Sequence, residues 1–176
     1  MIFVTVGTHE QQFNRLVEYM DKWAGEHEEE VIIQTGYSTY EPKYATWSKL
    51  YPYQKMVEFV DEARIVITHG GPSSFIMPLQ VGKTPIVVPR QYKYNEHVND
   101  HQVKFSKEVE KRLGNIIDVE NIDMLGSVIQ NFENYDKTKK IQAIMKNSAK
   151  LWKILLMICL RGINRYETCL FNSGTQ

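Results

Sequence analysis

Two glycine-containing segments, each placed directly after a predicted strand, carry residue types that can hold a phosphate group. The first is Gly7-Thr8-His9, and the second is His69-Gly70-Gly71-Pro72-Ser73-Ser74. Glycine lets the backbone approach an anion closely, and the N–H groups at the start of a helix face negative charge. Proline suits the first helical turn, and serine hydroxyls add donors. We therefore expect both segments to bind one nucleotide-type ligand across the carboxyl ends of parallel strands. The alternative is an ordinary strand-to-helix turn, which uses the same residue types.

A second group of hydrogen-bonding side chains follows the predicted strand 85–89, in the segment 90–102. The guanidinium of Arg90 is suited to pairing with a phosphate through two hydrogen bonds. The predicted substrate-binding side chains here are Gln91 together with five that suit the hydroxyls of a sugar, namely Glu96, His97, Asn99, His101 and Gln102. The alternative is a solvated helix start, with Asn99 or Asp100 as its N-cap.

The sequence offers no complete catalytic arrangement. His9 is suited to polarising a phosphate or acting as a base, and Glu96 is the other catalytic candidate. His97 and His101 are four residues apart and can share a helix face, but no further cluster of metal ligands accompanies them. We therefore expect no bound metal and leave the catalytic residue open.

Composition narrows the class of protein. The chain has 176 residues, of which 43% are hydrophobic and 24% charged, which suits one globular domain with an added tail. Lysine plus arginine equals aspartate plus glutamate at 21 each, so no overall field attracts nucleic acid. No stretch has the roughly 20 apolar residues of a membrane-spanning helix, and no signal region precedes the first strand. We expect a cytoplasmic protein whose two cysteines are reduced.

The hydrophobic pattern predicts a parallel α/β sheet with helices on both faces. The predicted strands are 2–6, 31–35, 64–68, 85–89 and 115–119, with a short one near 46–49, and helical stripes lie between them. Pro78 is expected to kink or end its helix early. Residues 1–135 would form this domain. Residues 136–176 would form a helical extension whose last residues are disordered. Its apolar run from Leu151 is expected to cover a partner surface, the alternatives being contact with a membrane surface or an altered C-terminus.

Four ordered motifs resemble the C-terminal, UDP-sugar-binding half of glycosyltransferase family 28. They are Val4-Thr5-Val6-Gly7-Thr8 with Phe13 downstream, His69-Gly70-Gly71-Pro72-Ser73-Ser74, Gly82-Lys83-x-Pro85-Ile86-Val87-Val88-Pro89 and Asn99-Asp100-His101-Gln102. The resemblance covers about residues 1–135. The likeness is greatest to short stand-alone members of capsule and exopolysaccharide synthesis, which are similar to the catalytic subunit of the two-piece UDP-GlcNAc transferase.

This resemblance implies a Rossmann-like domain that is one half of a GT-B enzyme. It implies an inverting transfer of a hexose, with galactose in a β-1,4 bond as the specific expectation, from a UDP-sugar to a lipid-linked saccharide. It also implies no metal or other cofactor, since helix N-termini and Arg90 would stabilise the departing UDP. A membrane-associated partner subunit would bind the acceptor, which would place the protein peripherally at the inner face of the plasma membrane.

One departure from the family pattern leaves a second function open. Related enzymes commonly have a glutamate for the ribose hydroxyls in the helix after the Gly-Gly loop, whereas this chain has Met77, followed by Pro78. The alternative is therefore a catalytically silent regulatory module that binds a nucleotide sugar. A nicotinamide-dependent enzyme is disfavoured because the chain lacks both the G-x-G-x-x-G fingerprint and an acidic residue after the second strand.

Overall fold

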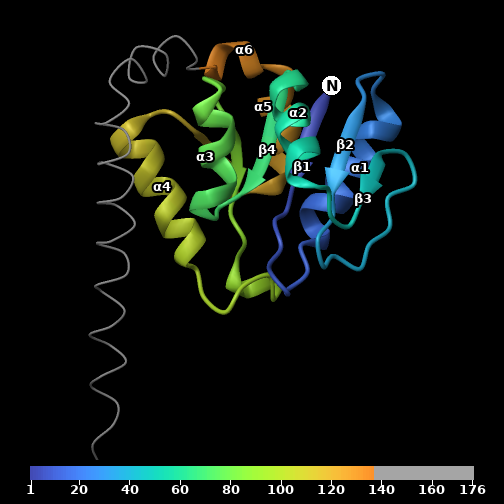
Figure 1. The fold of residues 1–176 in the computed structure, drawn as a ribbon. Helices are drawn as coiled ribbons and strands as arrows, with labels where there is room; N and C mark the ends of the chain where they lie inside the picture. The colour runs from blue at the N-terminus through green and yellow to red at the C-terminus, as the bar shows by residue number, and fades with distance from the viewer. Residues whose placement is uncertain (137–176) are drawn as a thin grey trace, which may run out of the picture. The chain divides into compact units, whose positions relative to one another are not determined.

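The structure, a computed structural model, describes residues 1–136. The predicted extension 136–176 therefore lies, except for its first residue, outside the described residues. Within them, one parallel sheet has the strand order β3-β2-β1-β4-β5-β6 (Figure 1). The strands are β1 (Ile2–Thr5), β2 (Val31–Gln34), β3 (Thr46–Ser48), β4 (Ile65–His69), β5 (Ile86–Val88) and β6 (Ile117–Asp118). The short strand expected near 46–49 is therefore confirmed as β3.

Helices connect the strands. They are α1 (Asn14–Glu26), α2 (Tyr53–Glu62), α3 (Pro72–Gln80), α4 (His101–Leu113), α5 (Leu125–Gln130) and α6 (Phe132–Tyr135), with short 3-10 turns η1 (Tyr92–Tyr94) and η2 (Ile122–Met124). The sheet order reverses between β1 and β4, which is where open parallel sheets form a ligand crevice. The loops after β1 and β5 reach the same edge of the sheet, at the bottom of Figure 1.

The core has two parts because successive strand residues face opposite sides of the sheet. Ile2 and Val4 of β1 pack in one apolar cluster that includes residues of α1 and α5. Phe3, between them, packs in another cluster with Phe59 and Val60 of α2. The expected arrangement of helices on both faces is thus confirmed. No helix among residues 1–136 has the length and apolar character needed to cross a bilayer.

The expectation that Pro78 ends its helix early is wrong, because α3 continues to Gln80. Proline lacks the N–H that would bond to the carbonyl one turn earlier, and its ring crowds that carbonyl, but here only two helical residues follow it. The chain then leaves the helix through two backbone hydrogen bonds, from Gly82 to Leu79 and from Lys83 to Pro78.

Candidate functional site

The two glycine segments come together because the strands that precede them are neighbours. Thr5 of β1 lies opposite Thr68 of β4, so the chain leaves both strands at the same place. A cleft of about 580 Å³ opens there. It is lined by Thr5, Gly7, Thr8, His9, Gln34, Met56, Val60, His69, Ser73, Ser74 and Met77. The predicted cooperation of the two segments therefore has a defined location in the fold.

The imidazole of His69 fills the space between the two segments. A Cβ built on Gly7 would lie 2.4 Å from Cε1 of His69, and one built on Gly71 would lie 2.5 Å from Nε2. Gly7 also has a φ of +75°, which side chains rarely adopt. Burial, together with the positive charge of Arg90, lowers the pKa of His69 to about 3. A neutral imidazole therefore separates the glycine loops at physiological pH.

The start of α3 faces this cleft without a side-chain cap. Gly71 occupies the N-cap position, Pro72 is the first helical residue, and the first turn contains no acidic side chain. Ser73 lines the cleft. The Ser74 hydroxyl is turned back, within 3.0 Å of the His69 carbonyl and 2.6 Å of the Gly71 carbonyl. The positive end of the helix dipole is thus available to an anion.

Gln102 joins the second glycine segment to β5 and α4. Its Oε1 accepts hydrogen bonds from the backbone N–H groups of Gly70 and Arg90, both at 3.1 Å. A Cβ on Gly70 would lie 2.9 Å from Cβ of Gln102, so the glycine is needed for this approach. In the described structure Gln102 therefore fixes the loop through its side-chain oxygen, which is directed at the backbone.

The structure places Arg90 inside the protein, with partners that differ from the expected phosphate. The side chain is fully buried. Its guanidinium donates to the backbone carbonyls of Val6, Gln11, Gln12 and Glu96 at 2.8–3.2 Å. Burial lowers the pKa of Arg90 to about 10, although the negative charge of Glu96 acts to raise it. The guanidinium therefore remains protonated at neutral pH. Arg90 thus positions the loop that carries His9.

Glu96 is also enclosed by protein partners. Both of its oxygens accept from Arg15, at 2.9 Å from Nε and 3.0 Å from Nη2, and Oε2 also accepts from the N–H of Gln91. Its side chain is 1% exposed. Gln91 in turn donates from Nε2 to the carbonyl of Glu120. Glu96 and Gln91 thus both bond to other parts of the protein, and the carboxylate accepts three hydrogen bonds from protein donors.

Three histidines lie around the mouth of the site. The rings of His9 and His97 are 5.1 Å apart, and His101 stacks 6.0 Å from Phe105 at the start of α4. Burial, followed by the positive charge of Arg90, lowers the pKa of His9. Burial, followed by His97, lowers the pKa of His101. His9 and His101 are therefore predominantly neutral near pH 7.

Asn99 forms the turn before α4, as the alternative interpretation of this segment had it. Its Oδ1 accepts from the N–H of His101 at 2.9 Å, while Asp100 holds the N-cap position and accepts from the N–H of Tyr92. Within residues 1–136, no group of three or more histidine, cysteine or acidic side chains is placed to hold a metal ion.

Sequence reasoning missed one buried carboxylate that organises the neighbouring loop. Asp21 of α1 is fully buried and accepts hydrogen bonds from the backbone N–H groups of Lys43, Tyr44 and Ala45 and from the hydroxyl of Tyr40. Burial raises its pKa, but these donors together outweigh burial and hold the pKa below its usual value. A charged residue within the apolar stripe of the predicted helix was the available indication.

The comparisons with known proteins agree with this geometry. A family model, the glycosyltransferase family 28 C-terminal domain, matches residues 1–154. No curated protein is significantly similar to the chain. The solved structure of the glycotransferase of kitacinnamycin matches with a TM-score of 0.61 and 16% identity, over 88% of this chain and 43% of that one. That of CalG4, the calicheamicin glycosyltransferase, matches with a TM-score of 0.57 and 12% identity, over 99% and 44%.

The chain spans less than half the length of these two solved proteins. At such low identity the likeness concerns the fold, and it confirms the Rossmann-like sheet of a single GT-B half.

Proposed function

Since the chain belongs to the family of glycosyltransferase family 28 C-terminal domains, we propose that it is the donor-binding half of a UDP-sugar-dependent glycosyltransferase. The diphosphate would lie in the cleft between the Gly7 turn and the start of α3. One observation carries this proposal: the uncapped helix start and the first glycine turn meet in one cleft, at the point where the strand order reverses.

In the proposed reaction, an acceptor hydroxyl oxygen forms a bond to C1 of the sugar on the face opposite the diphosphate. The bond from C1 to the β-phosphate oxygen breaks, and its electron pair leaves with UDP. The dipole of α3 and the hydroxyl of Ser73 would stabilise the charge that develops on the diphosphate, without a metal. His9 lines the same cleft and is the remaining candidate for the base that removes the acceptor proton.

The finer proposal follows the resemblance. The transferred sugar would be a hexose, with galactose in a β-1,4 bond as the preferred case, and the acceptor would be a lipid-linked saccharide in capsule or exopolysaccharide synthesis. A membrane-associated partner would supply the acceptor-binding half, which would hold this chain at the inner face of the plasma membrane. A half-cleft of this kind agrees with a chain that covers less than half of its structural neighbours.

The first test is isothermal titration calorimetry in EDTA with UDP, UDP-galactose and UDP-N-acetylglucosamine. We expect metal-free binding of UDP and a preference for one of the two sugars. Ser73→Ala should weaken UDP binding about fivefold, the value of one hydrogen bond. Ser127→Ala, in which the lost hydroxyl bonds to the Met124 carbonyl far along the chain, is the matched control. Absence of UDP binding by both the chain and its complex with a partner would refute the proposal.

A silent nucleotide-sugar-binding module is the second candidate. It is favoured by the observation that Arg90, Glu96 and Gln102 form their hydrogen bonds with other groups of the protein. Radiolabelled sugar transfer by the chain co-expressed with its partner separates the two functions. Transfer that is lost in His9→Ala supports the enzyme, whereas UDP binding without any transfer supports the module.

A further inference from the structure

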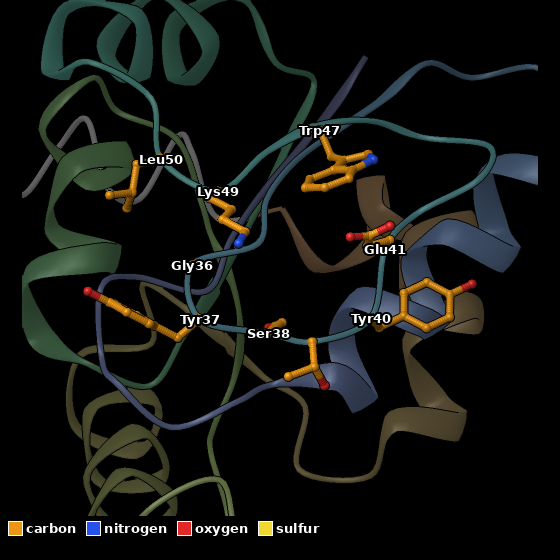
Figure 2. A pocket seen from close by; sticks show the side chains of 9 residues that line it. Gly36, Tyr37, Ser38, Tyr40, Glu41, Trp47, Lys49 and Leu50 are labelled. Carbon is orange, nitrogen blue, oxygen red and sulfur yellow. The ribbon is translucent and has the colours of Figure 1, made fainter.

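A second hollow opens beside the donor cleft, at the carboxyl ends of β2 and β3. Its volume is about 450 Å³, within the range of roughly 300–1,000 Å³ that is typical of small-molecule sites. It is lined by Gly36, Tyr37, Ser38, Thr39, Tyr40, Glu41, Trp47, Lys49 and Leu50. In Figure 2, Trp47 and Glu41 lie on one side of the pocket and Tyr37 and Leu50 on the other, with Lys49 between them. We call it the Trp47 pocket.

The Trp47 pocket combines aromatic surface with two unpaired charges. Glu41 and Lys49 are both exposed, and in the described part of the chain neither takes part in an ion pair. Opposite charges in one small pocket give little net attraction for either an anion or a cation. They do provide strong hydrogen-bond acceptors and donors beside an apolar ring face. This is the set of groups that suits a neutral ligand with one apolar face and many hydroxyls.

The walls of this pocket are fixed before any ligand arrives. Trp47 donates from Nε1 to the carbonyl of Pro42 at 3.1 Å, which orients its ring. Tyr40 donates from its hydroxyl to Asp21 at 2.8 Å, and Asn14 accepts from the backbone N–H groups of Thr39 and Tyr40. A loop without regular secondary structure is thus held by side chains of α1. Such preorganisation lowers the entropic cost of binding.

The pocket also lies next to the proposed donor site. Gly36, which lines the Trp47 pocket, has a φ of +54°, and a Cβ on it would lie 2.5 Å from the carbonyl oxygen of Gly7. Gly7 lines the donor cleft. The two hollows are therefore separated by the backbones of two glycines in direct contact. A molecule in the Trp47 pocket would be a neighbour of a nucleotide sugar bound in that cleft.

From these observations we propose that the Trp47 pocket is a saccharide subsite that holds a hexose unit of the acceptor. The apolar face of the hexose packs on Trp47, and its hydroxyls bond to Glu41 and Lys49. The assignment of this hexose to the acceptor rests on the proposed function. Binding of a saccharide as such is inferred from the residues of the pocket alone. The acceptor-side contacts would then be shared between this chain and its partner.

The test is a ¹H–¹⁵N titration of the full chain with methyl β-D-glucopyranoside and cellobiose, each with and without saturating UDP. We expect saturable shifts of the Trp47 indole N–H and of the amides of residues 36–41, tighter for the disaccharide. Lys49→Met should raise Kd about fivefold, as for one lost hydrogen bond. Lys43→Met, an exposed lysine of the same loop outside the pocket, should leave Kd unchanged.

Trp47→Ala should abolish the shifts, but Trp47 also packs against the core, so this substitution can disturb the fold. The variant of the exposed Lys49 is therefore the decisive one. Absence of saturable shifts from the wild-type chain while UDP binds would overturn this inference and leave the proposed function intact. Saccharide binding without UDP binding would support the subsite, and the titration of the chain with its partner would then decide on the donor site. Shifts that are equal in Lys49→Met and wild type would also overturn the proposed mode of binding.

Discussion

Arg15 of α1 holds the carboxylate of Glu96, 81 residues further along the chain, by two parallel hydrogen bonds of 2.9 and 3.0 Å. The pair is nearly closed to solvent, with side-chain exposures of 13% for Arg15 and 1% for Glu96. It joins the helix after the first glycine turn to the polar loop after β5. Removing one partner leaves the other as a buried charge without compensation.

Glu96→Gln should therefore lower the free energy of unfolding by about 3–5 kcal/mol, as is typical of a broken buried ion pair. Urea denaturation at pH 7 measures this loss. Glu18→Gln, on an exposed pair with Lys22, is the control and should change stability by less than about 0.5 kcal/mol. If Glu96→Gln were as stable as wild type but lost transfer, Glu96 would be a catalytic group.

His69 should stay neutral throughout the physiological range. Its pKa is about 3 in the folded protein, against about 6.5 in the unfolded chain. Between these values the unfolded chain binds a proton that the folded one does not. The stability that this group contributes is thus complete above pH 6.5. It is lost as the pH falls, by up to about 1.4 kcal/mol per pH unit.

The NMR signal of the His69 Cε1 proton, assigned by its loss in His69→Asn, should show no titration midpoint between pH 8 and pH 5. A midpoint near pH 6.5 would mean that the ring is not enclosed between Gly7 and Gly71 as the structure describes.

Because Met77 stands where related enzymes have a glutamate, the site should not distinguish a ribose from a 2′-deoxyribose. Met77 lies one helical turn beyond Ser73 on α3, beside Met56 and Val60, so this wall of the cleft is apolar where a nucleoside would follow the diphosphate. We expect UDP and 2′-deoxy-UDP to bind within about threefold of each other, since no charged acceptor meets the 2′-hydroxyl.

The variant Met77→Glu should favour UDP over 2′-deoxy-UDP by about tenfold, because a hydrogen bond to a carboxylate contributes about 1.5 kcal/mol or more. Competition calorimetry gives the ratio, and Met77→Leu is the neutral control. A wild-type preference for UDP above tenfold would show that another residue recognises the ribose.

Asp21 should govern the ionisation of Tyr40. Their hydrogen bond, followed by burial, raises the pKa of Tyr40 to about 12. A folded pKa above the unfolded value near 10 stabilises the protein fully below pH 10, and this contribution is lost as the pH rises from 10 to 12. In Asp21→Asn, ultraviolet titration should return one tyrosine towards pH 10.

The same Asp21→Asn substitution should lower the free energy of unfolding by at least about 3 kcal/mol, because a carboxylate with four donors becomes an amide that itself donates. An unchanged tyrosine titration would contradict the hydrogen bond. Tyr37→Phe, at an exposed tyrosine of the same loop, controls for the assignment.

The sequence allowed the meeting of the two glycine segments to be predicted, because neighbouring parallel strands deliver their loops to one edge. The roles of Arg90 and Glu96 could not be predicted in this way. Their partners are backbone carbonyls and an arginine 78–84 residues away, and the printed sequence carries no mark of such contacts. A charged residue in a polar loop looks solvent-exposed until the fold closes over it.

The early end that was one of the two outcomes expected for α3 at Pro78 is wrong for a local reason. A proline in a helical pattern suggests a break, but the cost is small when only one hydrogen bond is lost near the helix end. The short strand β3 was found from a weak pattern, and the loop before it owes its order to Asp21 and Asn14 on another element. Order of that kind comes from tertiary contacts, which local propensity does not contain.

Arg90 gives this edge of the sheet a dynamic property. Its guanidinium donates hydrogen bonds to backbone carbonyls directly after β1, in the turn before α1 and in the loop after β5. Fluctuations of these segments are consequently linked, because the opening of any one of them removes a hydrogen-bond partner from the buried guanidinium. A nucleotide that reduces the motion of the Gly7 turn would also slow amide hydrogen exchange in the loop after β5. Binding would thus affect residues that the ligand does not contact.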